Sequence, residues 1–381
     1  MDPNTLSVIQ GAAGAAGGGD PAKYVEEVFS TDLWDGTGST HSITNDIDLT
    51  EGGLVWTKVR DAADNHYLAD SGRGKTGIYF DELASSSNYN SQTSRTWGIT
   101  SFNSDGFSCG GDNTQFNSSS YEYASWSFRK APGFFDVVTY TGDGVAGRTL
   151  PHSLGCVPGM IIVKVSISYD DWTVYHKSLG ATKYLVLNEK DGVGTNTDRW
   201  DDTAPTNTVF SIGTDDVVNL NGRQYVAYLF ADGDDTDAQI FGDGEDESII
   251  KCGTFSGNAT DNAIDLGWEP QWLMVKRSDT PSNSGHQDYT SWLIQDNMRG
   301  FGADGDTGHA DHFLWANGTA AEGVRGNLSG GVAHDYAFIA TPTGFRTENG
   351  GQVEFNHGSP ATYIYMAIRR GPMKTPEDAT E

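Results

Sequence analysis

The chain contains few cysteines and no long apolar segment. Its three cysteines, Cys109, Cys156 and Cys252, show no spacing typical of a metal site or a disulfide framework, so we expect reduced thiols. No apolar run is long enough to cross a bilayer, and no basic-then-apolar segment follows Met1. We therefore expect no membrane insertion and no ordinary secretion signal.

Basic residues are also scarce. The chain has 24 lysines and arginines against 52 aspartates and glutamates, which gives a formal net charge of −28. A field of this sign repels phosphate backbones, so we expect no nucleic-acid partner. Solubility in a salty medium accounts for such a charge, because counterions screen the repulsion, and calcium binding is the alternative.

Glycine and aromatic residues, by contrast, are abundant. The 381 residues include 48 glycines and are 36% apolar and 11% aromatic. Such a composition is typical of short strands joined by many turns and does not suit helical bundles. Alternating polar and apolar residues predict an all-β fold of tandem antiparallel β-sandwiches, and the pattern leaves open whether their topology is jelly-roll or immunoglobulin-like.

One hairpin pattern recurs three times along the chain. In each copy an apolar strand ends in a lysine, and a polar turn, a second apolar strand and a glycine follow. The lysines are Lys58, Lys164 and Lys276, which lie 106 and 112 residues apart. Three diverged copies of one pattern indicate a repeated domain, so we expect the modules to superpose with these lysines at equivalent strand ends.

The segments around each hairpin repeat as well. Every copy closes on an aromatic strand, at residues 123–128, 225–230 and 363–368. A turn of the pattern Asp/Thr-Gly-Phe precedes two of these strands, at residues 105–107 and 343–345. Each module therefore starts and ends with its own strands, which is what independent sandwiches require.

Composition shifts divide the chain into parts. Glycine and alanine dominate residues 11–19, which form either a flexible tail or a docking peptide that orders against a neighbour. Residues 24–29 are rich in valine and aromatics, and we expect a strand there. We assign an N-terminal arm at 1–23, module one at 24–131, module two at 132–231, an acidic solvated linker at 232–248, module three at 249–371 and a polar tail at 372–381.

Module two carries five characteristic segments. They are 135–144 (FDVVTYTGDG), 152–155 (HSLG), 158–164 (PGMIIVK), 171–176 (DWTVYH) and 200–206 (WDDTAPT). Together they resemble a repeat of tailed-phage virion proteins, especially from phages of marine cyanobacteria, that are usually described as tail-fibre-like or lectin-like. The start of the chain resembles the start of such proteins, and the resemblance covers most of the sequence. It implies concanavalin A-like, jelly-roll β-sandwiches.

The resemblance also implies a function. A non-enzymatic structural protein is expected on the outer surface of the virion, in the tail or on the capsid, and it would be made in the host cytoplasm. As a tail-fibre-like attachment component it would form a homo-oligomer such as a trimer, bind other virion proteins and contact a host-surface glycan. Alternatives are a capsid or tail decoration protein and, from other classes, a glycan-degrading depolymerase or a secreted carbohydrate-binding protein.

Candidate catalytic motifs lack the context that they need. Residues 106–110 (GFSCG) match the G-x-S-x-G nucleophile pattern, which needs a strand before it and a helix after it, but residues 103–105 (NSD) precede it and residues 111–113 (GDN) follow, so no helix can start. The carboxylates of residues 245–247 (EDE) are consecutive, so neighbouring side chains would point to opposite faces. We therefore expect no enzyme, no catalytic residue and no cofactor.

The acidic clusters do not match metal sites. An EF-hand loop that began at Asp232 would need glycine at its sixth position and glutamate at its twelfth, where this chain has Asp237 and Asp243. A second cluster lies in a glycine-rich stretch and is more typical of an exposed loop tip. Its residues are Asp304, Asp306, His309, Asp311 and His312. We therefore expect no bound metal.

Tryptophan is the most informative residue type for binding. The chain has 10 tryptophans and 16 tyrosines, which is more than three small cores require. Trp97, Trp200 and Trp315 lie in or beside polar loops, and exposed rings can stack on sugars or anchor subunit contacts. These three are the candidate sugar- or partner-binding residues, with packing under a loop as the alternative for each.

Overall fold

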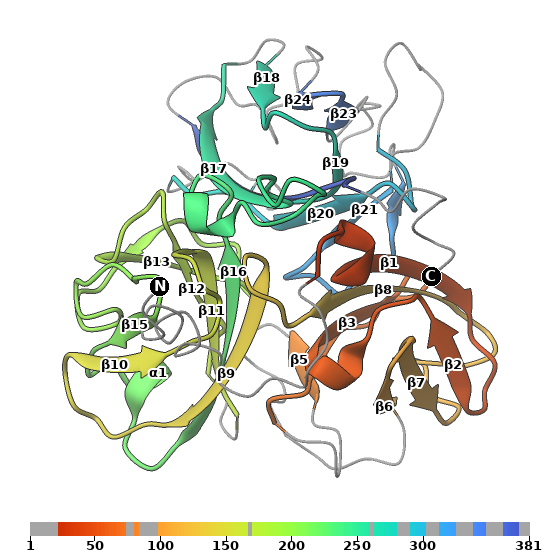
Figure 1. Ribbon diagram of the computed structural model, residues 1–381. Coiled ribbons are helices and arrows are strands. Elements are labelled where there is room, and N and C mark those ends of the chain that lie inside the picture. Colours follow the sequence, from red (N-terminus) through yellow and green to blue (C-terminus); the bar gives the residue numbers. More distant parts are fainter. Residues whose placement is uncertain are drawn as a thin grey trace, which may run out of the picture.

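The computed structural model describes residues 22–73, 80–83, 98–166, 170–258, 262–279, 290–301, 312–324, 338–347 and 361–372 (Figure 1). These residues form an almost entirely antiparallel β structure, so the all-β sandwich fold expected from the sequence is confirmed. The helical pieces in the described residues are short. They are η1 (Val25–Glu27), η2 (Leu49–Glu51), α1 (Asp216–Asn219) and η3 (Thr236–Ala238).

Module one packs a five-stranded sheet of order β1-β8-β3-β4-β5 against a three-stranded sheet of order β2-β7-β6. Apolar side chains such as Ile43, Val55 and Phe107 fill the space between the two sheets. The strands are β1 (Phe29–Asp35), β2 (His41–Thr44), β3 (Gly53–Val59), β4 (His66–Asp70), β5 (Phe80–Leu83), β6 (Gly98–Asn103), β7 (Gly106–Gly110) and β8 (Glu122–Arg129).

Module two packs a six-stranded sheet of order β14-β13-β12-β11-β16-β9 against a two-stranded sheet of β10 and β15. Leu150, Phe210 and Ile212 of the smaller sheet are buried. The strands are β9 (Phe135–Thr141), β10 (Arg148–Pro151), β11 (Pro158–Val165), β12 (Thr173–His176), β13 (Lys183–Val186), β14 (Gly194–Thr195), β15 (Val209–Ile212) and β16 (Gln224–Ala231).

Module three packs a six-stranded sheet of order β17-β25-β19-β20-β21-β22 against a three-stranded sheet of order β18-β24-β23. Its interior contains the stacked rings of Phe255 and Tyr363, whose centroids lie 4.9 Å apart. The strands are β17 (Ile250–Ser256), β18 (Asn262–Asp265), β19 (Pro270–Arg277), β20 (Trp292–Asp296), β21 (His312–Trp315), β22 (Gly323–Val324), β23 (Ile339–Thr341), β24 (Gly344–Thr347) and β25 (Thr362–Arg369).

The three modules share one strand order. In each larger sheet the first strand pairs with the last, the last with the third, and the third with the fourth. Within this order each lysine of the repeated hairpin lies opposite the third residue of the module's closing strand, β8, β16 or β25. The pairs are Lys58–Ala124, Lys164–Val226 and Lys276–Ile364. The expected equivalence of the lysines is thus confirmed.

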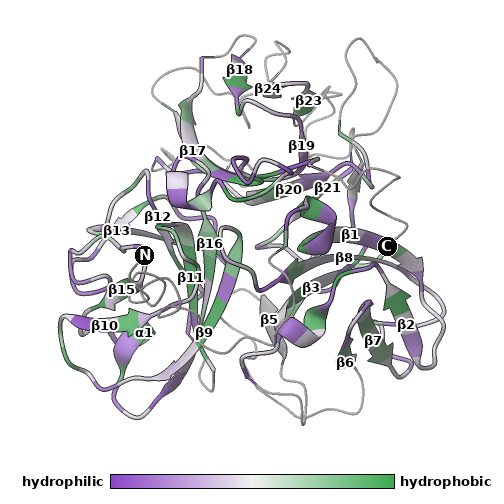
Figure 2. Cartoon of the chain, viewed as in Figure 1, coloured by the Kyte–Doolittle hydropathy of each residue, from purple (hydrophilic) through white to green (hydrophobic). Residues whose placement is uncertain are grey.

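The larger sheets turn their outer faces toward one another in the middle of the molecule (Figure 1). Trp126, Tyr228 and Met366 take the same position on the three closing strands, and all three belong to one hydrophobic cluster that spans the modules. The Trp126 and Trp272 ring centroids lie 6.5 Å apart across two modules. Figure 2 shows the hydrophobic residues following the central strands β9, β11 and β16. The modules therefore share a core besides their own interiors.

Two sequence-based expectations about the connections were wrong. Residues 24–29 were expected as a strand, but Val25–Glu27 form a 3-10 turn and the strand starts at Phe29, because Val25 and Val28 turn into the shared core. The linker at 232–248 is not simply solvated, since Ala238 and Phe241 are fully buried in that core. Both segments gain burial from neighbouring modules.

Candidate functional site

A buried ion pair marks the seam between modules one and two. The guanidinium of Arg73 donates through Nε to the Asp70 carboxylate and through Nη2 to the Leu68 carbonyl at 3.2 Å. Tyr228 of module two donates its hydroxyl to the same carboxylate at 2.9 Å and lies 3.1 Å from Arg73 Nη2. Because Asp70 is fully buried, the two modules are joined through a desolvated charge pair. We call this arrangement of an aspartate, an arginine and an aromatic residue of the next module a clasp.

The same clasp recurs at the seam between modules three and one. Arg299 donates through Nε to Asp296 at 2.7 Å and through Nη2 to the Ile294 carbonyl at 3.3 Å. Trp126 of module one, which takes the position of Tyr228, donates its indole N–H to Asp296 at 3.0 Å. At the third seam His176 replaces the aspartate and binds the Tyr365 carbonyl at 3.2 Å. The contacts therefore run cyclically around a pseudo-threefold arrangement.

Two seams are further closed by backbone hydrogen bonds beyond the clasps. The Glu322 amide donates to the Arg60 carbonyl, and the Val193 amide donates to the Ser278 carbonyl at 2.7 Å. Arg60 and Ser278 each follow the repeated lysine by two residues, and Ser166 holds the same place in module two. Among the described residues, no module-one amide donates to the Ser166 carbonyl.

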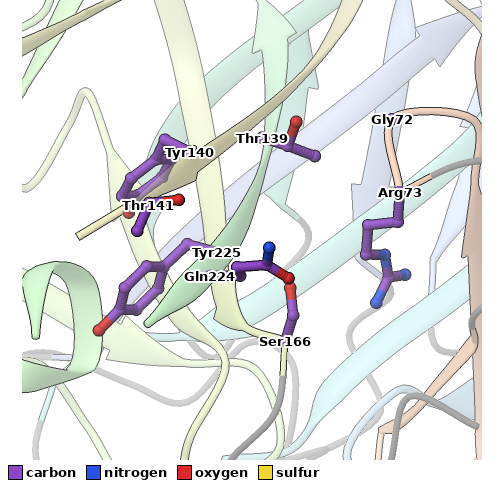
Figure 3. Close-up of a pocket in the computed structure, with 8 residues that line it drawn as sticks. All are labelled: Gly72, Arg73, Thr139, Tyr140, Thr141, Ser166, Gln224 and Tyr225. Carbon is purple, nitrogen blue, oxygen red and sulfur yellow. The ribbon is translucent and has the colours of Figure 1, made fainter. Parts of the chain in front are cut away.

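A cavity of about 410 Å³ lies at this third place, between modules one and two (Figure 3). Arg73 lies on one side, and Thr139, Gln224 and Ser166 lie on the other. The described lining residues are Gly72, Arg73, Thr139, Tyr140, Thr141, Ser166, Gln224 and Tyr225. The site thus combines groups from β9, β16 and the end of β11 with the turn after β4.

Strand register explains the polar lining. Thr141 pairs with Gln224, and the Ser166 amide donates to the Gln224 carbonyl at 2.7 Å, which places these three residues in one row across the sheet. Val137 and Tyr228, further along the same face, are buried. The sheet face therefore changes from apolar to polar where it leaves the shared core, and the cavity lies over the polar part.

Gly72 forms a close approach between the modules. A Cβ added at this position would lie 3.1 Å from Val137 Cγ2 and 3.2 Å from Thr139 Cγ2. Such contacts are tighter than ordinary van der Waals spacing, so a larger residue would push the turn of module one away from β9. Glycine lets the turn carry Arg73 close to the threonines.

The two tyrosines of the lining are structural. Tyr140 donates its hydroxyl to the Val218 carbonyl at 2.8 Å, and Tyr225 donates to the Asp216 carbonyl at 2.6 Å. Burial raises the pKa of Tyr225 to about 12 and raises the pKa of Tyr140 as well. Both hydroxyls therefore stay protonated near neutral pH and serve as hydrogen-bond donors within module two.

The structure separates the tryptophans that we expected to bind ligands. Trp200 is only 2% exposed, donates its indole N–H to the Lys183 carbonyl at 3.1 Å and packs edge-on against Tyr175. No ring face is open to a ligand, so the expected binding role of Trp200 is wrong. The ring instead packs in the core of module two. Trp315 is half-buried in β21 beside Phe313, and Trp97 lies outside the described residues.

Other candidate groups are also committed to the fold. Ser108 of the G-x-S-x-G pattern lies within strand β7, where its hydroxyl is 3.0 Å from that of Ser42, so no nucleophile elbow forms. The three cysteines are buried free thiols, and burial raises the pKa of Cys109 and of Cys156 to about 12. Such thiols are poor nucleophiles.

The repeated lysines are buried, and each donates to backbone carbonyl groups, Lys164 to that of Asp170 at 2.7 Å. Lys58 donates to the Val59 and Ala62 carbonyls, and Lys276 donates to the Thr290 carbonyl and across the seam to the Lys190 carbonyl. Burial lowers the pKa of Lys58 to about 8 and that of Lys276 to about 7. The Lys58 side chain therefore stabilises the turn that follows it, and the Lys276 side chain also joins modules two and three.

The described residues contain no group of three or more His, Cys, Asp or Glu placed to hold a metal ion. Most of the second acidic cluster, Asp304 to Asp311, lies outside them. No helix in the described part of the chain is long and apolar enough to cross a membrane.

One family model matches residues 20–372 and therefore spans all three modules as a single unit. The chain belongs to the DUF7483 family. The model is described as a domain of unknown function, and no curated protein matches the chain. The cavity of this DUF7483 domain was not foreseen from the sequence, although the repeated Asp-x-x-Arg at 70–73 and 296–299 signals the clasps beside it.

Proposed function

We propose that this DUF7483 protein is a non-enzymatic structural component of a phage particle, a tail-fibre-like or other outer attachment part that takes part in host recognition. Its expected partners are further copies of itself, other virion proteins and a host-surface glycan. The resemblance of the module-two segments to tailed-phage virion proteins supports the proposal.

The cyclic closure of the three modules is the observation that carries it. Clasps such as Asp296–Trp126 and Asp70–Tyr228 join each module to the next through fully buried groups. A catalytic cleft between domains usually needs an interface that can open, whereas these seams share a continuous hydrophobic core. Modules that are joined through one buried core suit a structural role.

Labelling of particles tests this function. Antibodies raised against the purified protein are bound to intact phage particles from a culture that produces it, and gold-conjugated secondary antibody marks their position in electron micrographs. We expect gold on the tail or another outer organ, with none from pre-immune serum. Gold on the capsid surface would favour the decoration alternative, and accessible particles without gold would overturn the proposal.

A glycan-degrading depolymerase is the rival from another class. The lining of the cavity carries no carboxylate among its described residues, whereas glycosidases use a pair of them. Incubation of the protein with host envelope polysaccharide should release no reducing ends above a heat-denatured control. Release that a single carboxylate substitution abolishes would instead establish the enzyme.

A further inference from the structure

The seam between modules one and two differs chemically from the equivalent seam between modules three and one. At the seam between modules three and one, the Glu322 carboxylate lies 2.7 Å from Arg60 Nε and 3.6 Å from Arg299 Nη1. Arg299 and Arg60 correspond to Arg73 and Ser166, which both line the cavity. An acidic side chain therefore fills, at one seam, the space that forms the cavity at the other.

Charge balance indicates what would fill the cavity. At the filled seam Arg60 and Arg299 pair with Asp296 and Glu322, and Arg60 also pairs with the exposed Glu122 carboxylate at 3.2 Å. In the cavity Arg73 is already balanced by Asp70, and serine replaces the second arginine at Ser166. Among the described lining residues a carboxylate there would meet no cation besides Arg73, and the net charge of −28 would repel it further. A neutral ligand is favoured over an anion.

The lining indicates a ligand rich in hydroxyl groups. Thr139 and Thr141 offer hydroxyls that both donate and accept, Gln224 offers a carboxamide, and Ser166, which is only 1% exposed, forms part of the cavity wall. Thr139, Thr141 and Gln224 are exposed, so their polar ends are available. Arg73 is held by Asp70 and the Leu68 carbonyl, so it loses little freedom when a ligand binds beside it.

We propose that this cavity binds a neutral mono- or disaccharide unit of a glycan. Its volume of about 410 Å³ lies within the usual range of small-molecule sites, roughly 300–1,000 Å³. Hydroxyl and amide groups of module two form hydrogen bonds with the sugar hydroxyls, and Arg73 of module one contacts the sugar from the opposite side of the cavity. The binding site is thus formed by two modules, which explains why neither module's sequence alone indicates it.

The test uses the full chain and defined sugars. Binding of glucose, galactose, mannose, N-acetylglucosamine, maltose and lactose is measured by ligand-observed NMR and titration calorimetry at millimolar concentrations, with glucuronic acid and an uncharged hexapeptide as competing classes. We expect at least one neutral sugar to bind, with no binding of glucuronic acid or the peptide.

Substitutions locate the binding to the cavity. Gln224→Ala and Thr141→Val each remove a hydrogen-bonding group and should weaken binding by roughly 3- to 10-fold. Thr362→Ala and Ser256→Ala, at the equivalent positions of module three, should leave it unchanged. All variants are first shown to melt at the wild-type temperature. Absence of neutral-sugar binding, preference for the acid or peptide, or equal losses in the control variants would overturn the inference.

The inference deepens the proposed function, since it rests on contact with a glycan, but its test needs no particle. If gold labels the virion and no sugar binds the cavity, the inference alone fails. If a sugar binds and particles carry no gold, the virion role fails while the binding site stands.

Discussion

Trp126 of module one donates its indole N–H to the carboxylate of Asp296 in module three over 3.0 Å, and both side chains are fully buried. The same carboxylate binds Arg299, whose guanidinium carbon lies 5.2 Å from the centre of the Trp126 ring. The Asp296 carboxylate thus pairs with a buried cation of its own module and accepts a hydrogen bond from the neighbouring module. Removal of this carboxylate should therefore weaken both contacts.

Asp296→Ala should lower the free energy of unfolding by about 3–5 kcal/mol, because the buried Arg299 loses its main partner and keeps, among the described carboxylates, only that of Glu322, 3.6 Å from Nη1. Trp126→Phe, which keeps the ring and removes only the N–H, should cost about 1–3 kcal/mol. Chemical denaturation monitored by tryptophan fluorescence and circular dichroism measures both. Asp246→Ala in an exposed turn is the control and should change the value by less than about 0.5 kcal/mol. Equal effects of Asp296→Ala and the control would contradict the clasp.

His176 should make the protein sensitive to mild acid. Burial lowers its pKa from 6.5 to about 4, and the neutral ring satisfies both nitrogens, with Nε2 on the Tyr365 carbonyl and Nδ1 accepting from the Ser178 amide. The folded pKa lies below the unfolded one, so the contribution is complete above pH 6.5 and is lost as the pH falls toward 4. The loss is of the order of 3 kcal/mol.

His176→Gln isolates this effect from other acid-sensitive groups such as His66. The amide can still donate to the Tyr365 carbonyl but does not titrate. Unfolding free energies of wild type and variant are compared between pH 7 and pH 4.5, and the wild type should fall more steeply. Parallel curves would show that His176 is not the acid-sensitive group.

Lys276 should give the same direction of pH dependence as His176, but in a more alkaline range. Burial lowers its pKa from 10.5 to about 7, so between these values the unfolded chain carries a proton that the folded chain lacks. Stability from this group therefore rises with pH between about 7 and 10. Lys276→Met cannot titrate, and its unfolding free energy should rise less with pH between 7 and 9 than that of the wild type. Identical slopes would mean that the amine stays protonated in the fold.

Trp200→Ala tests packing against binding. The ring is buried against Tyr175, so its removal should cost about 3–5 kcal/mol through the cavity that it leaves. Trp200→Phe should cost less, because it keeps most of the apolar volume. If Trp200→Ala melted like the wild type and instead lost glycan binding, the ring would be a ligand contact and not a core residue.

The repeat was readable from the sequence because local signals set it. An apolar strand, a lysine, a turn and a glycine recur at similar spacing, and the register places Lys58, Lys164 and Lys276 at one position. The turns at 105–107 and 343–345 also connect strands as expected. Strand alternation and turn chemistry act over a few residues, so they leave a direct trace in the chain.

The packing of the modules against one another is harder to predict from the sequence. Val25, Phe241 and Trp200 lie in segments whose neighbours are polar, and each is buried through contacts with residues far away in sequence. The cavity arises in the same way, since Arg73 and Gln224 are separated by a whole module. Composition therefore indicated exposed loops where the structure buries side chains.

The sequence by itself determined the all-β class, the three-module repeat, the reduced cysteines and the buried lysines' common register. Only the tertiary structure decided that the modules close cyclically around a shared core, that Asp70 and Asp296 join them, and that Trp200 packs inside. The physical reason is that strand pairing within a module follows from local alternation, whereas contact between modules depends on which outer face each sheet buries. That choice is made by complementary side chains such as Trp126 and Asp296, which come together only when the chain has folded.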